Sequence, residues 1–151
     1  MDGRHYHTLV WVPMFLVGLS ALVLGLVYSS FSAPWLLDKK ANELLLGVSY
    51  TSLFSQTINQ NLSSYLLLIY RFFGWWLVSI GLLISSFVYI TKMGTPTSRN
   101  TLHLVTFFVL LGIYRIEYTF IPSSPFLWLT HVLSFMLFLS IFGSLRLKKY
   151  D

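Results

Sequence analysis

Arg115 and Glu117 stand inside an otherwise apolar stretch, residues 110–121. A charged side chain in the hydrocarbon of a membrane costs about 2.5–3.5 kcal/mol on insertion scales, so such residues usually face a protein interior or water and find a partner. A carboxylate in such a place could help to bind a small molecule, abstract a proton or fasten one helix to another. This stretch is therefore the most informative one for function.

Two further polar residues are expected at the same depth. If four spans alternate in direction, Arg71, Arg115, Glu117 and His131 all lie about 6–11 Å below the outer ends of their helices, at a rise of 1.5 Å per residue. We call these four residues the polar layer. Arg115 and Glu117 are about 200° apart around a helix, so they must use different neighbours. We expect Glu117 to pair with Arg71. Arg115 is expected to meet His131, a backbone carbonyl or a bound anion, or to extend to the membrane surface.

Two interpretations of the polar layer stay open. In the first, its charges fasten helices to one another inside the bundle. In the second, they line a polar pocket that opens outward and binds a small molecule or a lipid head group. Proton abstraction by Glu117 is chemically possible, but the spacing does not select it, and we assign no catalytic residue.

Metal and haem chemistry are not expected. A haem held between spans needs two axial histidines at similar depth, whereas His103 and His131 are expected near opposite ends of the bundle. One glutamate and one histidine in the polar layer are too few for a zinc or di-iron site. We therefore expect neither a metal nor a cofactor.

The composition indicates an integral membrane protein. The chain has 151 residues, of which 56% are hydrophobic and 10% charged, and its mean hydropathy is +0.71. A soluble domain would carry about a quarter charged residues. The length suits four spans of about 20 residues in a single domain covering residues 1–151. Since there is no cysteine, disulfides and thiolate ligands are excluded. The net charge of +5 is located beside apolar runs, so we expect a lipid bilayer rather than nucleic acid as the partner.

Four apolar runs predict an all-α fold of four antiparallel transmembrane helices. Gly and Pro residues mark the short turns between the later runs. The longest connection, residues 32–63, has apolar side chains at helical spacing, which predicts a short helix lying on the membrane surface or against the bundle. A lid over a site is the functional alternative for this connector. The expected spans are residues 8–31, 64–92, 101–121 and 126–146.

Glycines predict where the spans touch. Gly18 and Gly25 are seven residues apart on the first span, and Gly74 and Gly81 have the same spacing on the second, so each pair lies on one helical face. Faces without side chains let neighbouring helices approach closely. Gly112 is expected to serve in the same way on the third span.

The distribution of basic residues predicts the orientation. With four spans, both termini lie on one side of the membrane together with the turn at residues 92–100. The opposite side carries Lys39 and Lys40. The positive-inside rule then predicts a multi-pass protein of the cell membrane with both termini in the cytoplasm. The basic residues on the terminal side are Arg4, Lys92, Arg99, Arg146, Lys148 and Lys149.

Three short motifs resemble those of small four-helix membrane proteins of the DoxX-like kind. They read Ile69-Tyr-Arg-Phe-Phe-Gly74, Ile80-Gly-Leu-Leu83 and Leu111-Gly-Ile-Tyr-Arg115, and the likeness covers the last three spans. Trp75 and Trp76 stand where that family tends to have small residues, so the packing there is expected to differ. The resemblance implies a four-helix fold and service as a partner in a larger membrane assembly. It carries over no catalytic residue.

The sequence as a whole favours a non-catalytic accessory subunit that stabilises or regulates a larger membrane complex, with other subunits or as a homo-oligomer. Its aromatic content of 18% and its small-residue faces offer adhesive surfaces, and its parts outside the membrane are too small to act alone. The alternative is a small-molecule or lipid-binding protein, a transporter or an enzyme, that uses the polar layer near the outer leaflet. A subunit should co-purify with a larger partner in fixed ratio, whereas a binding protein should behave alone.

Overall fold

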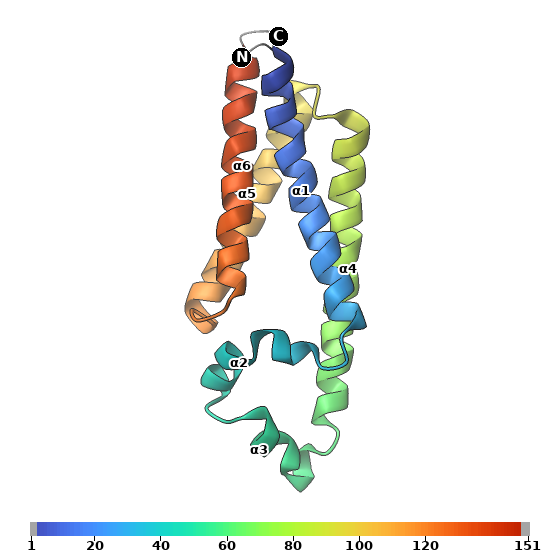
Figure 1. Cartoon of the computed structure of the whole chain (residues 1–151), viewed down its shortest axis with the longest axis vertical. Coiled ribbons are helices and arrows are strands. Elements are labelled where there is room, and N and C mark those ends of the chain that lie inside the picture. The colour runs from blue at the N-terminus through green and yellow to red at the C-terminus, as the bar shows by residue number, and fades with distance from the viewer. Residues whose placement is uncertain (1–2, 149–151) are drawn as a thin grey trace.

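The computed structural model describes residues 3–148, and no strand occurs among them. Four long helices are each long and apolar enough to cross a membrane, which confirms an all-α architecture with four candidate spans. They alternate in direction along the bundle (Figure 1). Their bounds are α1 (Gly3–Ser30), α4 (Leu62–Thr91), α5 (Pro96–Phe120) and α6 (Phe126–Leu147).

Three helices begin earlier than the sequence predicted, α4 by two residues and α1 and α5 by five each. α1 starts at Gly3, so the polar segment before the first apolar run is already helical. α5 starts at Pro96 instead of residue 101. The side chain of Thr95 accepts a hydrogen bond from a backbone N–H in the first turn, and Pro96 occupies a position where a missing N–H costs nothing. The proline that suggested a turn therefore opens a helix, and the turn before it is shorter than predicted.

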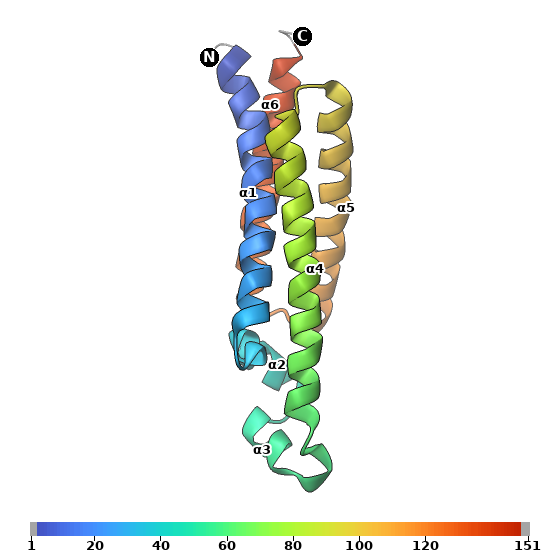
Figure 2. The same ribbon diagram turned by 90° about the vertical axis from the view of Figure 1, so that its right-hand side faces the viewer.

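The long helices form two pairs that splay apart toward one end (Figure 1). α1 packs closely along α4, as Figures 1 and 2 both show, and its other side packs against α6. α6 in turn contacts α5, which gives the spatial order α4, α1, α6, α5. The start of α1 and the end of α6 lie together where the pairs converge (Figure 1). Although α4 and α5 are consecutive, they are not packed against each other.

Four glycines lie in the contact between α1 and α4. A Cβ atom added at Gly25 would lie 2.6 Å from the carbonyl oxygen of Gly74, and one added at Gly74 would lie 2.8 Å from that of Gly25. Gly18 and Gly81, which lie seven residues away from Gly25 and Gly74 on the same two helices, are equally crowded. Because the backbones approach this closely, only glycine fits at these positions without a shift.

Gly112 does not take part in the packing of this chain. It is exposed on α5, and an added Cβ would meet no atom within 4 Å. The reason is that the buried side of α5, which includes Thr106, Leu110 and Glu117, is a different face of the helix. The expectation that Gly112 supports helix packing within the chain is therefore not met.

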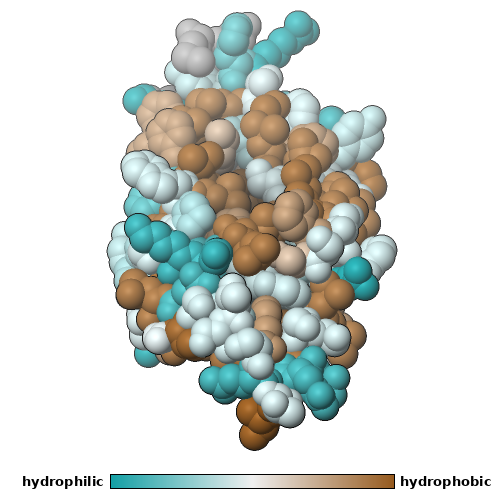
Figure 3. Space-filling view, turned by 60° about the horizontal axis from the view of Figure 1, so that its bottom comes forward, coloured by the Kyte–Doolittle hydropathy of each residue, from teal (hydrophilic) through white to brown (hydrophobic). Residues whose placement is uncertain are grey.

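The connector, residues 31–61 in the structure, lies across the open end of the splayed helix pairs (Figure 1). The sequence predicted one short helix here, whereas the structure has four short segments. Figure 3 views this end and shows hydrophilic side chains near its tip, where a hydrophobic side chain also protrudes, with hydrophobic ones over much of the bundle behind. The segments are η1 (Pro34–Asp38), α2 (Lys39–Leu46), α3 (Tyr50–Ser55) and η2 (Thr57–Asn59).

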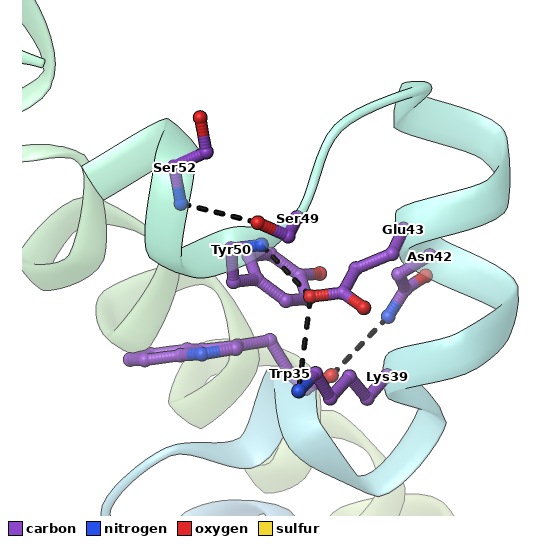
Figure 4. A network of polar contacts seen from close by, with 7 residues as sticks. All are labelled: Trp35, Lys39, Asn42, Glu43, Ser49, Tyr50 and Ser52. Atoms are coloured by element: carbon purple, nitrogen blue, oxygen red, sulfur yellow. Dashed lines mark hydrogen bonds and ion pairs between the residues drawn. The ribbon is translucent and has the colours of Figure 1, made fainter. Parts of the chain in front are cut away.

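Internal contacts give the connector a defined shape (Figure 4). Glu43 Oε1 accepts a hydrogen bond of 2.8 Å from the backbone N–H of Tyr50, and Asn42 Nδ2 donates one of 3.4 Å to the carbonyl oxygen of Trp35. The rings of Trp35, Tyr50 and Phe54 pack together with centroids 5.5–6.3 Å apart. The connector is therefore a folded element that can hold its own residues in place against the bundle.

Candidate functional site

Glu117 is the one member of the polar layer that is buried, with 5% of its surface exposed. Its Oε1 accepts a hydrogen bond of 3.0 Å from Thr130 Oγ1 on α6. The expected ion pair with Arg71 does not form, and Arg71 is exposed on α4. The physical reason is the helix order, because α1 and α6 separate α4 from α5. Similar depth along the helices therefore did not bring these two side chains together.

The other members of the polar layer lie at the surface of the chain. His131 is exposed, its Nδ1 contacts the carbonyl oxygen of Leu127, and its ring meets the edge of Tyr114 at a centroid distance of 5.4 Å. Arg71 and Arg115 make no hydrogen bond or ion pair with any residue from 3 to 148. The polar layer is thus not one cluster.

A second buried carboxyl group reaches this end of the bundle from the connector. Asp38 is the last residue of η1 and is 7% exposed. Its Oδ2 accepts a hydrogen bond of 2.8 Å from the hydroxyl of Ser124, which lies between α5 and α6. The two hydroxyls that hold these carboxyl groups both contact the backbone of Phe126, since Ser124 Oγ accepts a hydrogen bond from its N–H and Thr130 Oγ1 lies 3.2 Å from its carbonyl oxygen. We refer to Asp38 and Glu117 as the carboxyl pair.

Each member of the carboxyl pair has one oxygen bonded to a hydroxyl and one oxygen without a partner. Asp38 Oδ1 and Glu117 Oε2 are buried, and no residue from 3 to 148 donates a hydrogen bond to them. Leaving a buried acceptor unsatisfied costs about 1–3 kcal/mol, and more when it is charged. This region can therefore accept a hydrogen-bond donor or a positive charge at two atoms.

The side chain of Asp38 does not cap the helix that follows it. It occupies the N-cap of α2, where an aspartate usually accepts a hydrogen bond from a backbone N–H of the first turn and contributes about 1 kcal/mol. Its side chain makes no such bond and turns to Ser124 instead. Burial raises the pKa of Asp38 above its usual 3.8, while the hydrogen bond from Ser124 works in the opposite direction.

Aromatic side chains surround this end of the bundle. The ring of Tyr28 on α1 stacks on Tyr70 at 5.6 Å, meets Phe73 at 5.5 Å and lies 5.9 Å from Phe126 of α6. Burial, the largest effect, raises the pKa of Tyr50 in the connector to about 12, so this phenol stays neutral at physiological pH. These rings make this end of the bundle largely apolar.

A separate polar cluster joins three helices near the termini. Ser140 Oγ on α6 donates a hydrogen bond of 2.6 Å to the carbonyl oxygen of Val10 on α1. Because this uses the single hydroxyl proton, His103 Nε2 on α5, at 2.7 Å, is the donor to Ser140 Oγ. His103 and Ser140 are both buried, and so is Arg99 one turn earlier on α5. This cluster fastens α1, α5 and α6 to one another.

Sequence reasoning missed Asp38, Ser124 and Thr130. Asp38 precedes two lysines, which is the usual pattern of a solvated charge, and Ser124 stands in a Pro-Ser-Ser-Pro turn. One signal was available, because Asp38 follows Trp-Leu-Leu and is therefore attached to an apolar segment that could be buried. Within residues 3–148, no group of three or more His, Cys, Asp or Glu side chains is placed to hold a metal ion.

Comparisons with protein-family models, with curated proteins and with solved structures find no significant match to this chain. The resemblance to DoxX-like proteins therefore stays a prediction.

Proposed function

We propose that this chain is a non-catalytic accessory subunit that stabilises or regulates a larger membrane complex. The observation that carries the proposal is the exposed face of α5 that contains Gly112 and Arg115. These residues are three positions apart, so they lie on the same side of the helix. On this face Gly112, which has no side chain, lies beside the unpaired positive charge of Arg115, and both residues are within a candidate span.

The chemistry of this face suits a second transmembrane helix. Arg115 has no partner from residues 3–148, and a charge facing hydrocarbon is costly unless it is paired or extends to the surface. An acidic or polar side chain on the partner would satisfy the guanidinium. Gly112 would let the two backbones approach closely, as small residues do at helix contacts in membranes.

The loose attachment of α5 to its own bundle also favours this proposal. Among the long helices α5 packs mainly on α6. An apolar groove of about 360 Å³ lies between these two helices, lined by Phe107, Leu110, Tyr114 and Leu137 among others. A helix with one close neighbour leaves most of its circumference for another chain.

Purification from native membranes in a mild detergent tests the proposal. We expect the chain to elute with a larger species of fixed stoichiometry, made of other subunits or further copies. A Gly112→Leu variant should lose that species and keep its own thermal stability, because the site is open within the chain. The matched control is Ser86→Leu on the exposed side of α4, which should retain the species. Elution as a monomer, or equal retention by both variants, would contradict the proposal.

The proposal places the chain in the cell membrane with both termini in the cytoplasm. Support comes from the basic residues near the end where the termini meet, which include Arg4, Lys92 and Arg146, whereas Lys39 and Lys40 belong to the connector. Lys149, which the sequence adds to the first group, lies outside the described residues.

The absence of cysteine allows this orientation to be tested with single labels. A membrane-impermeant maleimide added to intact cells should label Thr51→Cys in the connector. It should label Thr97→Cys, near the α4–α5 turn, only after permeabilisation. Both positions are exposed, so accessibility in the folded chain is matched. The reverse pattern would overturn the orientation.

A further inference from the structure

We propose that Asp38 and Glu117 together bind a small monovalent cation, an inorganic ion such as Na⁺ or a primary ammonium group, where the connector meets the α5–α6 hairpin. This inference goes beyond the role of an accessory subunit and holds whether or not the chain has a partner. It starts from the two unpartnered oxygens, Asp38 Oδ1 and Glu117 Oε2.

The two carboxyl groups come from different elements and are each more than nine-tenths buried. Each is held by one hydroxyl, Ser124 for Asp38 and Thr130 for Glu117, which fixes one oxygen and leaves the other free. The two hydroxyls also contact the backbone of the same residue, Phe126, so both carboxyl groups are held at the start of α6. Two buried carboxylates there destabilise the folded chain unless positive charge compensates them. A bound cation supplies that charge and satisfies both oxygens at once.

The described part of the chain does not supply this cation from its own lysines and arginines. Lys39, next to Asp38, is exposed and lies 3.9 Å from Glu43 instead. Arg71 and Arg115 make no ion pair with residues 3–148. His131 makes no ion pair with residues 3–148, and its Nδ1 contacts a backbone carbonyl of its own helix. Positive charge for the carboxyl pair must therefore come from outside this set.

The small number of protein ligands argues against a calcium or magnesium site. Calcium takes six to eight oxygen ligands, and magnesium keeps several waters in a strict octahedron. The described residues offer two carboxyl groups here and no third acidic or histidine side chain in a metal-binding arrangement. An ammonium group has three N–H donors, which suits two free carboxylate oxygens and one further acceptor. Burial raises the pKa of Asp38, which shows that this environment opposes uncompensated negative charge.

Thermal unfolding of the full chain in detergent micelles tests the inference. Tryptophan fluorescence is followed at neutral pH and constant ionic strength, with N-methylglucamine chloride replaced stepwise by sodium chloride or by methylammonium chloride. We expect one of these small cations to raise the Tm by about 5 °C at saturating concentration, because it binds only the folded chain. The cation that produces the shift identifies the inorganic or the organic form of the ligand.

Two site variants and one control test whether the dependence of Tm on the cation arises at the carboxyl pair. Asp38→Asn and Glu117→Gln should each abolish the dependence of Tm on the small cation. The control is Glu43→Gln, which makes the same change of charge in the connector but can keep the hydrogen bond from the Tyr50 N–H, and it should respond like the wild type. If one of the two site variants fails to fold, the other variant and the wild-type titration still decide.

Two results would overturn the inference. One is a wild-type Tm that does not depend on which cation is present, which would leave water or protons as the partners of the free oxygens. The other is a cation response that survives in Asp38→Asn and Glu117→Gln. Both results concern the isolated chain, so neither depends on the fate of the proposed membrane complex.

Discussion

Ser124 donates a hydrogen bond of 2.8 Å to Asp38, and this contact joins the loop between α5 and α6 to the end of η1. Both residues are buried. The helix pairs splay apart at this end, so the bond ties the connector to the hairpin across the open side of the bundle (Figure 1). The hydroxyl of Ser124 also accepts a hydrogen bond of 3.1 Å from the N–H of Phe126. One side chain thus couples the start of α6 to the connector.

Replacing this hydroxyl should destabilise the chain. In Ser124→Ala, both oxygens of the buried Asp38 carboxyl group would lack a hydrogen-bond donor, and we expect a loss of about 1–3 kcal/mol in the free energy of unfolding. Denaturant unfolding in detergent measures this loss. Ser123→Ala is the control, because Ser123 is the exposed neighbour and its loss should change stability by less than about 0.5 kcal/mol. Equal effects of the two substitutions would contradict the role of the Ser124–Asp38 bond.

Stability should depend on pH through Asp38. Its pKa is raised by burial, so the folded chain holds this proton more tightly than the unfolded chain does. The stabilisation from this group is fully present below its usual pKa of 3.8 and is lost as the pH rises through the raised value. In N-methylglucamine buffer, Asp38→Asn should remove this part of the dependence and gain stability relative to the wild type as the pH increases from 4 toward 7. Parallel Tm curves for the two proteins would refute this expectation.

The four long helices could be predicted from the sequence because long apolar runs are a local property of the chain. Gly18, Gly25, Gly74 and Gly81 are a second local signal, since a spacing of seven keeps each pair on one face. The start of α5 was placed too late because Pro96 has two uses, as a breaker within a helix and as a good first residue. Only the preceding Thr95, which caps the helix, indicates that Pro96 is a first residue here and not a breaker.

The candidate site could be predicted only in part. The depth of Arg71 and Glu117 follows from the rise per residue, but whether they meet depends on which helices are neighbours, and short turns do not determine that. Asp38 was missed because its burial is a property of the folded connector and not of the residues around it in sequence. Glu117 was found because a carboxylate in an apolar run is visible without a structure.

Substitutions of two glycines should have opposite effects on stability. In Gly25→Ala the new methyl group would lie 2.6 Å from the carbonyl oxygen of Gly74, so α1 and α4 must move apart, at a cost of about 1–3 kcal/mol. In Gly112→Ala the methyl group meets open space, and the gain in helix propensity should leave stability unchanged or raise it by up to about 1 kcal/mol. Thermal unfolding of the isolated chain compares them. Loss of stability in Gly112→Ala alone would reverse our assignment of the two faces.

Apolar side chains of α2 should enter the membrane surface. Leu44 and Leu45 are 70% and 55% exposed and adjoin the folded interior of the connector, so water is a poor environment for them. Because the chain has no cysteine, a spin label on Leu44→Cys reports this one position. Reconstituted in vesicles, the label should collide more often with dissolved oxygen than with a water-soluble nickel complex. Thr51→Cys, exposed on α3, should show the reverse preference. If the Leu44 label were as open to nickel as the Thr51 label, the connector would stand in water and the carboxyl pair would lie beneath a soluble cover instead of a membrane-bound one.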